Sequence, residues 1–235
     1  MKLAGHRGLA GIAPENTLAG VHQAAKHNIG WVEVDVQLSQ DGVPVIIHDE
    51  TVNRCSNGSG SVRELSWQQL QQLDFGSWFA EQYQQERIPN LSQLLACCKE
   101  LALKLNLEIK LYPEDDIKRL VQTVADTLAQ SAFAADQLII SSFSHEALLQ
   151  CQEMMPSIRR GHLWEGIPDD WAEQLSEIDA FSVHCDYQRL TQIQAAAIKR
   201  AGYELYTYTP NDPTTVAKHW QWGVDMMISD NAHLY

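Results

Sequence analysis

Eight short apolar runs, separated by helical segments, are the feature of this sequence that most restricts its fold. Each run is rich in apolar or β-branched side chains and is bounded by turn residues, which is typical of buried strands. Strands that alternate with helices predict a parallel sheet, and eight is the number that closes a (β/α)8 TIM barrel. The runs cover residues 2–6, 31–37, 103–110, 137–143, 158–164, 180–185, 204–209 and 226–230.

Three of the intervening segments carry helix signals. Residues 15–28 open with the capping sequence Pro-Glu-Asn-Thr, which starts at Pro14. Residues 113–131 have acids in the first turn, which suits the helix dipole. Residues 212–223 start with Asp-Pro and stop at Gly223. An open, doubly wound sheet is the alternative architecture. The barrel is preferred because no glycine-rich dinucleotide-binding motif follows the first strand.

The domain organisation follows from length and composition. The chain has 235 residues, of which 45% are hydrophobic and 20% charged, and this predicts one globular domain over residues 1–235. Residues 50–95 interrupt the strand–helix rhythm, and we expect them to form a small insertion after the second strand. Its aromatic cluster of Trp78, Phe79 and Tyr83 either forms a small core within the insertion, which we favour, or shapes a site at the barrel mouth.

Charge and cysteine usage narrow the class of partner. A net charge of −13 argues against binding to nucleic acid or an anionic membrane surface, because no basic patch is available. No run approaches the roughly 20 apolar residues of a membrane-spanning helix, and no signal segment opens the chain. The five cysteines lack zinc or redox spacing. We expect a cytoplasmic protein that binds small molecules; the sequence does not fix its oligomeric state.

Acidic side chains interrupt two of the predicted strands. Glu33 and Asp35 share one face of the second strand, and Glu108 and Lys110 share one face of the third. In a barrel these polar faces point inward, and their C-terminal ends form the active-site mouth. Three converging carboxylates favour a hard divalent cation such as Mg²⁺ or Ca²⁺. In the alternative, one acid pairs with Lys110 or Arg7 and the others are merely solvated.

Two histidines are predicted to reach the same place. His6 ends the first strand, and the Asp41-Gly42 pair is typical of a two-residue hairpin turn. Counting outward from that turn sets Asp35 opposite His48, with Cβ atoms about 5 Å apart. Two histidines beside a carboxylate cluster suit a general acid and a general base.

Several stretches, in order along the chain, carry a family resemblance: "HRGLAGIAPENT", "EVDVQLSQDGVPVIIHDETVNRCSNGSG", "LDFGSWF", "LNLEIK", "SSF" and "WGVDMMISD". Together they resemble the glycerophosphodiester phosphodiesterase family, and its cytoplasmic bacterial branch linked to glycerol-phosphate uptake in particular. The resemblance implies a TIM barrel with a small insertion and metal-dependent hydrolysis of glycerophosphodiesters to glycerol 3-phosphate and an alcohol.

The resemblance also implies roles for individual residues. His6 and His48 match the acid and base, Arg7 and Lys110 the phosphate contacts, and Glu33, Asp35 and Glu108 the ligands of one divalent metal ion, Mg²⁺ or Ca²⁺.

One departure from the family pattern lies at residues 208–211, Tyr-Thr-Pro-Asn, where the proline must end the strand. It weakens the case for a substrate contact from Asn211 but leaves Tyr208 as an aromatic wall of the substrate site.

Two alternatives remain at this point. A phospholipase D-like or sphingomyelinase D-like lyase resembles the family at the same histidine and Glu-x-Asp positions, but such proteins are typically secreted and disulfide-bonded. A catalytically inactive barrel that only binds glycerophosphates would be expected to lack one of the rim residues, and all are present.

Overall fold

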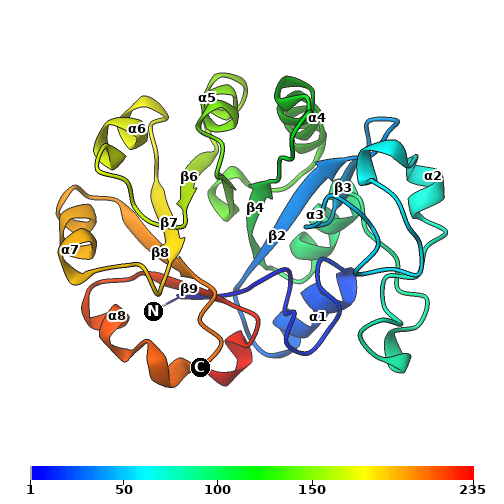
Figure 1. The fold of residues 1–235 in the computed structure, drawn as a ribbon, viewed down its shortest axis with the longest axis horizontal. Coiled ribbons are helices and arrows are strands. Elements are labelled where there is room, and N and C mark those ends of the chain that lie inside the picture. Colours follow the sequence, from blue (N-terminus) through cyan, green and yellow to red (C-terminus); the bar gives the residue numbers. More distant parts are fainter. Residues whose placement is uncertain (1) are drawn as a thin grey trace.

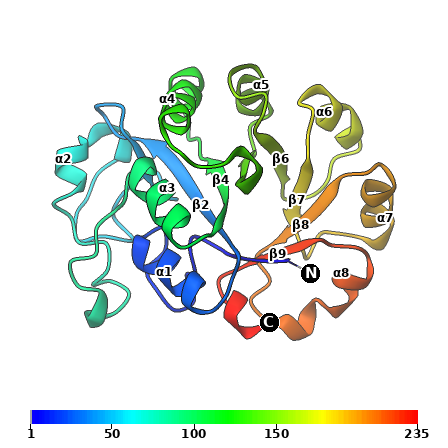
Figure 2. The same ribbon diagram turned by 180° about the vertical axis from the view of Figure 1, so that it is seen from behind.

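The computed structural model describes residues 2–235, and its centre is a closed barrel of eight parallel strands. The first strand pairs with both the second and the last, which closes the sheet. The helices surround this barrel, as Figures 1 and 2 show from opposite ends, so the predicted (β/α)8 TIM barrel is confirmed. The strands are β1 (Lys2–Gly5), β2 (Trp31–Leu38), β4 (Lys104–Ile109), β5 (Leu138–Ser142), β6 (Arg159–Trp164), β7 (Ser182–Asp186), β8 (Glu204–Tyr208) and β9 (Met226–Ser229).

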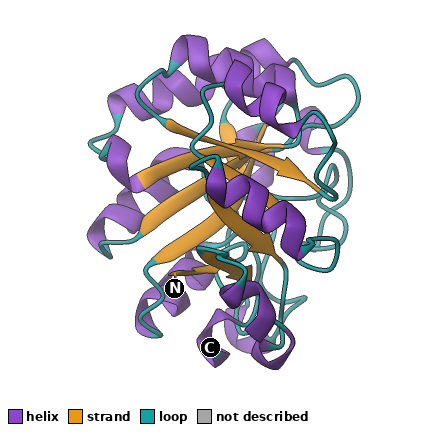
Figure 3. Cartoon of the chain, turned by 90° about the vertical axis from the view of Figure 1, so that its left-hand side faces the viewer, coloured by secondary structure: helices purple, strands orange, loops and turns teal. Residues whose placement is uncertain are grey.

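The outer layer consists of helices that pack against the barrel, with the strands crossing obliquely inside them (Figure 3). The α-helices are α1 (Leu18–Lys26), α2 (Trp67–Leu70), α3 (Leu91–Glu100), α4 (Ile117–Gln130), α5 (His145–Met154), α6 (Trp171–Glu177), α7 (Gln192–Arg200) and α8 (Ala217–Gln221). Short 3₁₀ turns are η1 (Val62–Glu64), η2 (Glu81–Tyr83), η3 (Ala135–Gln137), η4 (Pro213–Thr215) and η5 (Ala232–Leu234). No helix in the described range 2–235 is long and apolar enough to cross a membrane.

Two of the three predicted helices are present as α1 and α4, although both begin later than predicted, and the third is divided in two. Helix α1 begins after Thr17, whose side chain accepts a hydrogen bond from the backbone N–H of Gly20. Helix α4 begins after Asp116, which caps it, so all three acids expected in its first turn (Glu114, Asp115 and Asp116) precede the helix. The segment predicted as one helix over 212–223 is a 3₁₀ turn, η4, followed by the short helix α8.

Strand alternation divides the barrel into two environments. On β2, Val32, Val34 and Val36 are fully buried and pack with the surrounding helices in one large apolar cluster. The intervening residues of the same strand point inward. Inside the barrel, away from its mouth, Tyr206 and Met226 belong to a separate apolar cluster. The inward polar residues of β2 and β4 therefore lie on the mouth side of this apolar cluster.

A short strand, β3 (Pro44–Ile46), runs antiparallel to β2 on the outside of the barrel. Val36 lies opposite Ile46, and the pairing continues to Ser39, whose N–H donates to the Val43 carbonyl at 3.0 Å. The loop therefore has three residues, 40–42, and Gly42 adopts a φ of +80°. This is a three-residue hairpin with glycine in the left-handed region, and the predicted two-residue turn is wrong.

The extra loop residue shifts the register by one. Asp35 faces Ile47, whose N–H donates to the Asp35 carbonyl at 2.9 Å, so the predicted pairing of Asp35 with His48 is also wrong. A one-residue slip turns each side chain to the opposite face. His48 nevertheless reaches the barrel mouth, because it follows the last residue of the ladder and lies in a bend.

Residues between β3 and α3 form the peripheral part labelled α2 in Figure 1. This part has a buried apolar cluster of its own, made of Val45, Ile47, Val52, Cys55, Val62, Leu70, Phe75 and Ile88. Trp78, Phe79 and Tyr83 are not in that cluster; they stack edge to face, with ring centroids 5.7 Å apart, and Trp78 is 40% exposed. The single-domain organisation of residues 1–235, with 50–95 as an insertion, stays a prediction.

Substituting Gly42 tests the left-handed conformation of this loop residue. Gly42→Ala places a Cβ at positive φ, and we expect it to lower the free energy of unfolding by about 1–2 kcal/mol, measured by urea denaturation. Gly30→Ala is the matched control, because no atom lies within 4 Å of the added Cβ. Equal stabilities of the two variants would contradict the loop conformation.

Candidate active site

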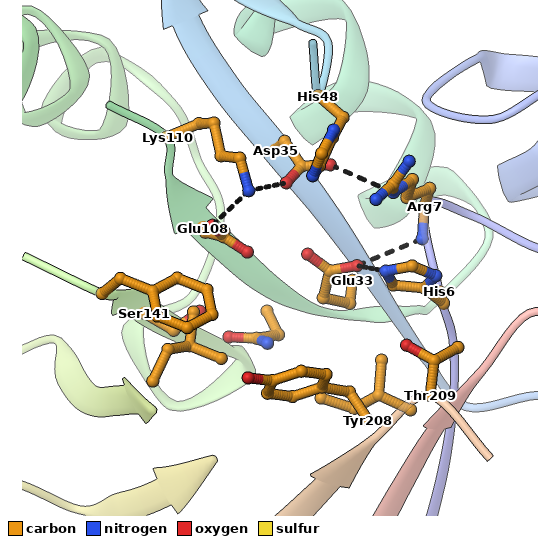
Figure 4. A pocket seen from close by; sticks show the side chains of 14 residues that line it. His6, Arg7, Glu33, Asp35, His48, Glu108, Lys110, Ser141, Tyr208 and Thr209 are labelled. Carbon is orange, nitrogen blue, oxygen red and sulfur yellow. Dashed lines mark hydrogen bonds and ion pairs between the residues drawn. The ribbon is translucent and has the colours of Figure 1, made fainter. Parts of the chain in front are cut away.

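The C-terminal ends of the barrel strands enclose a cavity of about 260 Å³. Figure 4 shows its lining, with carboxylates, imidazoles and cationic groups on one side and Tyr208 and Ser141 on the other. All eight side chains predicted from the sequence lie at this one cavity. The lining residues are His6, Arg7, Glu33, Asp35, His48, Asn106, Glu108, Lys110, Ser141, Phe143, Leu163, Tyr208, Thr209 and Ile228.

Three carboxylates form the centre of the site. Asp35 on β2 lies opposite Glu108 on β4, and Glu33 shares the inward face of β2 with Asp35. Each of the three is less than a tenth exposed, and one oxygen from each lies within 4.8 Å of the others. A set of carboxylate oxygens this compact is the ligand type that hard divalent cations such as Mg²⁺ and Ca²⁺ prefer.

Two cationic side chains offset this negative charge only in part. Lys110 Nζ lies 3.0 Å from Glu108 and 3.8 Å from Asp35, and Arg7 Nε lies 3.7 Å from Asp35. The ion pairs of the alternative considered from the sequence are therefore present, but none of the three acids is merely solvated, because all are buried. Arg7 also donates to Glu15 at 2.7 Å, however, so its charge is shared with a fourth carboxylate.

The protonation of the acids reflects this excess of negative charge. Burial, together with the charges of Asp35 and Glu108, raises the pKa of Glu33 well above its ordinary value. Burial and the charge of Asp35 raise the pKa of Glu108 to about 7. Both shifts show that the folded protein disfavours the fully ionised cluster. A bound divalent cation would remove that penalty, so the residues present fit such an ion.

Each histidine is held by a carboxylate at its Nδ1 atom. His6 Nδ1 lies 2.6 Å from Asp230 Oδ1, and His48 Nδ1 lies 2.8 Å from Asp49 Oδ1. This arrangement leaves the Nε2 atom of each ring directed toward the cavity, where His6 Nε2 is 3.8 Å from Glu33. Burial lowers the pKa of His48, against the opposing charge of Asp35.

Ion pairs connect the two sides of the site behind the histidines. Arg54 donates to both oxygens of Asp49, at 2.7 and 2.9 Å, and to both oxygens of Glu15, at 2.7 and 2.8 Å. Glu15 in turn accepts from Arg7. A continuous chain of charge-assisted hydrogen bonds therefore links His48 to Arg7 through Asp49, Arg54 and Glu15.

These supporting residues were missed by sequence reasoning, although signals for some of them were present. Asp49 follows His48 directly, and Asp230 ends the last predicted strand. Glu15 and Asn16 belong to a segment interpreted only as a helix start. Asn16 instead binds Asp35, donating to its carboxylate at 2.9 Å and accepting from its backbone N–H at 3.2 Å.

An apolar wall faces the charged side of the cavity. Tyr208 lies at the end of β8 and donates through its hydroxyl to the Trp164 carbonyl at 2.9 Å, which fixes its ring beside Phe143. As expected from the proline that follows, β8 ends at Tyr208. Asn211 does not line this cavity; it donates to Asp230 at 2.7 Å and so supports the partner of His6.

Comparison with known proteins places this arrangement in a family. A model of the glycerophosphoryl diester phosphodiesterase family matches residues 6–234. The chain belongs to this family. The family resemblance predicted from the sequence, and with it a phosphodiesterase enzyme, is confirmed.

Individual relatives of the glycerophosphoryl diester phosphodiesterase family match over nearly their whole length. The chain is 32% identical to the glycerophosphodiester phosphodiesterase of Caldanaerobacter subterraneus, with coverage of 96% of this chain and 92% of the relative. The solved structure of an Oleispira antarctica phosphodiesterase, in complex with the product sn-glycerol-3-phosphate, is 36% identical with a TM-score of 0.96. Coverage there is 100% of this chain and 94% of the other.

The raised pKa of Glu108 predicts a pH-dependent stability of the metal-free protein. Because the folded-state pKa, about 7, exceeds the ordinary value of 4.5, the folded state binds more protons between these values. The contribution of Glu108 to the free energy of unfolding is therefore fully present below about pH 4.5 and is lost as the pH rises through 7.

In chelator, we expect Glu108→Gln to remove this loss and to exceed the wild type in stability at pH 8 by up to roughly 3 kcal/mol, since one pKa unit corresponds to about 1.4 kcal/mol. The measurement is urea denaturation across pH 4 to 8. If the free energy of unfolding depended on pH in the same way in the wild type and the variant, the raised pKa of Glu108 would be contradicted.

Proposed function

We propose that this protein hydrolyses glycerophosphodiesters to glycerol 3-phosphate and an alcohol, with a divalent metal ion and two histidines. The observation that carries the proposal is the meeting of three buried carboxylates, two carboxylate-held imidazoles and two cationic groups at one cavity. These are the parts that a metal-assisted phosphoryl transfer requires.

The substrate class rests on the relatives. The Caldanaerobacter subterraneus relative is named a glycerophosphodiester phosphodiesterase, and the Oleispira antarctica structure holds sn-glycerol-3-phosphate as its product. With 36% identity over the whole of this chain, that structure supports glycerol 3-phosphate as the product here as well.

Charge compensation is the first part of the mechanism. Glu33, Asp35 and Glu108 would hold the metal ion, which would supply Lewis-acid stabilisation of the phosphate charge when bound. Arg7 and Lys110 contribute positive charge at the same rim. Burial would lower the pKa of Lys110, but the charges of Glu108 and Asp35 outweigh it and raise that pKa, so the side chain stays protonated. Tyr208 forms the wall against which the substrate lies.

Proton transfer is the second part. One histidine accepts the proton of the attacking hydroxyl, either the substrate's own glycerol 2-hydroxyl or a water molecule, and the other donates a proton to the departing alcohol. Attack by water gives glycerol 3-phosphate directly. Attack by the 2-hydroxyl gives a cyclic phosphate, which a water molecule then opens to glycerol 3-phosphate with the two histidines in exchanged roles. Asp230 and Asp49 fix the tautomers, because a carboxylate at Nδ1 accepts the N–H and leaves Nε2 for the reaction.

The experiment that tests the function is a coupled assay for glycerol 3-phosphate, run with several glycerophosphodiesters and Mg²⁺ or Ca²⁺. Release of glycerol 3-phosphate from glycerophosphocholine is the expected result. Turnover of choline lipids in preference to glycerophosphocholine would indicate the lyase instead, and binding without product release would indicate an inactive barrel.

Removing either imidazole should nearly abolish turnover. We expect His6→Ala and His48→Ala each to lower kcat by about 10²–10⁴-fold in this assay, the typical contribution of a positioned acid or base. His22→Ala is the matched control, since His22 is exposed on α1 and lies outside the cavity. Most of the wild-type activity surviving in either site variant would refute the acid–base pair.

Metal dependence is tested by chelation and by the acids themselves. We expect a chelator to abolish turnover of the wild type, and Mg²⁺ or Ca²⁺ to raise its Tm by an amount that grows with ion concentration. Glu33→Gln and Asp35→Asn should lose both responses, whereas Glu81→Gln, an exposed acid in η2, should retain them. Full activity in chelator would rule out the metal.

A further inference from the structure

Two buried polar side chains at the cavity are used neither by the fold nor by the proposed mechanism. Asn106 on β4 is 1% exposed and Ser141 on β5 is fully buried, and both line the cavity. Within residues 2–235, Asn106 Oδ1 and Ser141 Oγ have no hydrogen-bond partner. An unsatisfied buried polar atom costs roughly 1–3 kcal/mol, so two such atoms at one cavity indicate a ligand that pairs with them.

The neighbouring serine, Ser142, shows that the missing hydrogen-bond partner is specific to side chains that face the cavity and is not general to strand β5. Ser142 is equally buried, but its hydroxyl donates to the Ile109 carbonyl at 2.9 Å. Ser142 is absent from the cavity lining, whereas Ser141 points into it (Figure 4). The fold therefore satisfies the serine that it buries against the protein and leaves unpaired the one that faces the cavity.

The position of the two residues defines what they can contact. Asn106 lies opposite Glu33, and Ser141 lies opposite Glu108, so both adjoin the carboxylate cluster. The buried side chains of Leu163 and Ile228 complete this closed end of the cavity. Figure 4 shows Ser141 on the side of Glu108, apart from Arg7 and His48.

The chemistry of this closed end suits a small, neutral, hydroxylated group. Asn106 and Ser141 carry no charge, so they match a hydroxyl rather than a phosphate or an ammonium, while Leu163 and Ile228 suit the carbon chain. At the other end of the lining, Phe143 is 44% exposed and marks the open mouth. In glycerophosphodiesters the glycerol is small and constant, whereas the alcohol varies, and a closed end accepts only the constant part.

We propose that Asn106 and Ser141 bind a free hydroxyl of the glycerol esterified to the scissile phosphate, which holds the glycerol in the closed end and directs the alcohol toward Phe143. This inference rests on the proposed function for the identity of the substrate. It makes Asn106 and Ser141 the residues that distinguish glycerophosphodiesters from other phosphodiesters.

The test compares two ligands that differ only in their hydroxyls, glycerol 3-phosphate and n-propyl phosphate. Calorimetric titration of the wild-type protein with Mg²⁺ should show glycerol 3-phosphate binding about tenfold tighter or more, because a polar site left unpaired by the analogue disfavours it. Ser141→Ala and Asn106→Leu should each lower this ratio toward one, mainly by weakening glycerol 3-phosphate.

Ser142→Ala is the matched control. It removes a satisfied hydroxyl, so it should lower the Tm of the free protein but keep the affinity ratio, whereas Ser141→Ala should keep the Tm or raise it. The conservative Ser141→Ala keeps the test valid even where Asn106→Leu fails to fold.

Equal affinities of the wild type for the two ligands, or a wild-type ratio retained in Ser141→Ala, would overturn the hydroxyl site. Failure of both phosphates to bind would instead count against the proposed function itself.

Discussion

Burial of three carboxylates at one end of the barrel is the constraint on which the rest of the site depends. Side chains alternate between the two faces of each strand, and on the adjacent strands β2 and β4 this alternation turns Glu33, Asp35 and Glu108 toward the same part of the barrel interior. The raised pKa values of Glu33 and Glu108 show the cost of that arrangement. Arg7 and Lys110 reduce the cost without cancelling it, and the remaining negative charge is what makes the cavity suited to a divalent cation.

Charged residues behind the cavity hold the catalytic side chains in position. Asp230 and Asp49 each fix one imidazole, and Arg54 joins Asp49 to Glu15 and, through it, to Arg7. Arg54 lies in the segment between β3 and α3, so this peripheral segment takes part in the site from behind. Its contribution comes through the ion pairs of Arg54, because Trp78, Phe79 and Tyr83 do not line the cavity.

Much of the fold could be predicted from local pattern. The eight apolar runs appear as the eight strands of the barrel, because a strand buried on both faces needs a short apolar or alternating segment. The hairpin was harder, since Asp-Gly is compatible with turns of two or three residues and the count changes the partner of Asp35. The segment over 212–223 splits into η4 and α8, where the chain adopts a tighter turn than the helix signals suggest.

Strand alternation follows from the sequence alone, and it was enough to predict that Glu33, Asp35 and Glu108 lie close together, whereas the hairpin register used to position His48 was wrong. The residues that support these side chains were not predicted, because Asp230 is separated from His6 by nearly the whole chain and is its neighbour only once the barrel closes. The unpaired state of Asn106 and Ser141 could likewise not be predicted from the sequence, since whether a buried polar atom lacks a partner depends on every side chain around it.

The sequence by itself determined the number of barrel strands, the inward faces of β2 and β4 and the residue types at the barrel mouth, because these follow from periodicity along the chain. Only the tertiary structure decided which carboxylate holds which histidine, how Arg54 links them and which polar atoms remain for a ligand. Those contacts join strands and loops far apart in sequence, and closure of the barrel alone brings them within hydrogen-bonding distance.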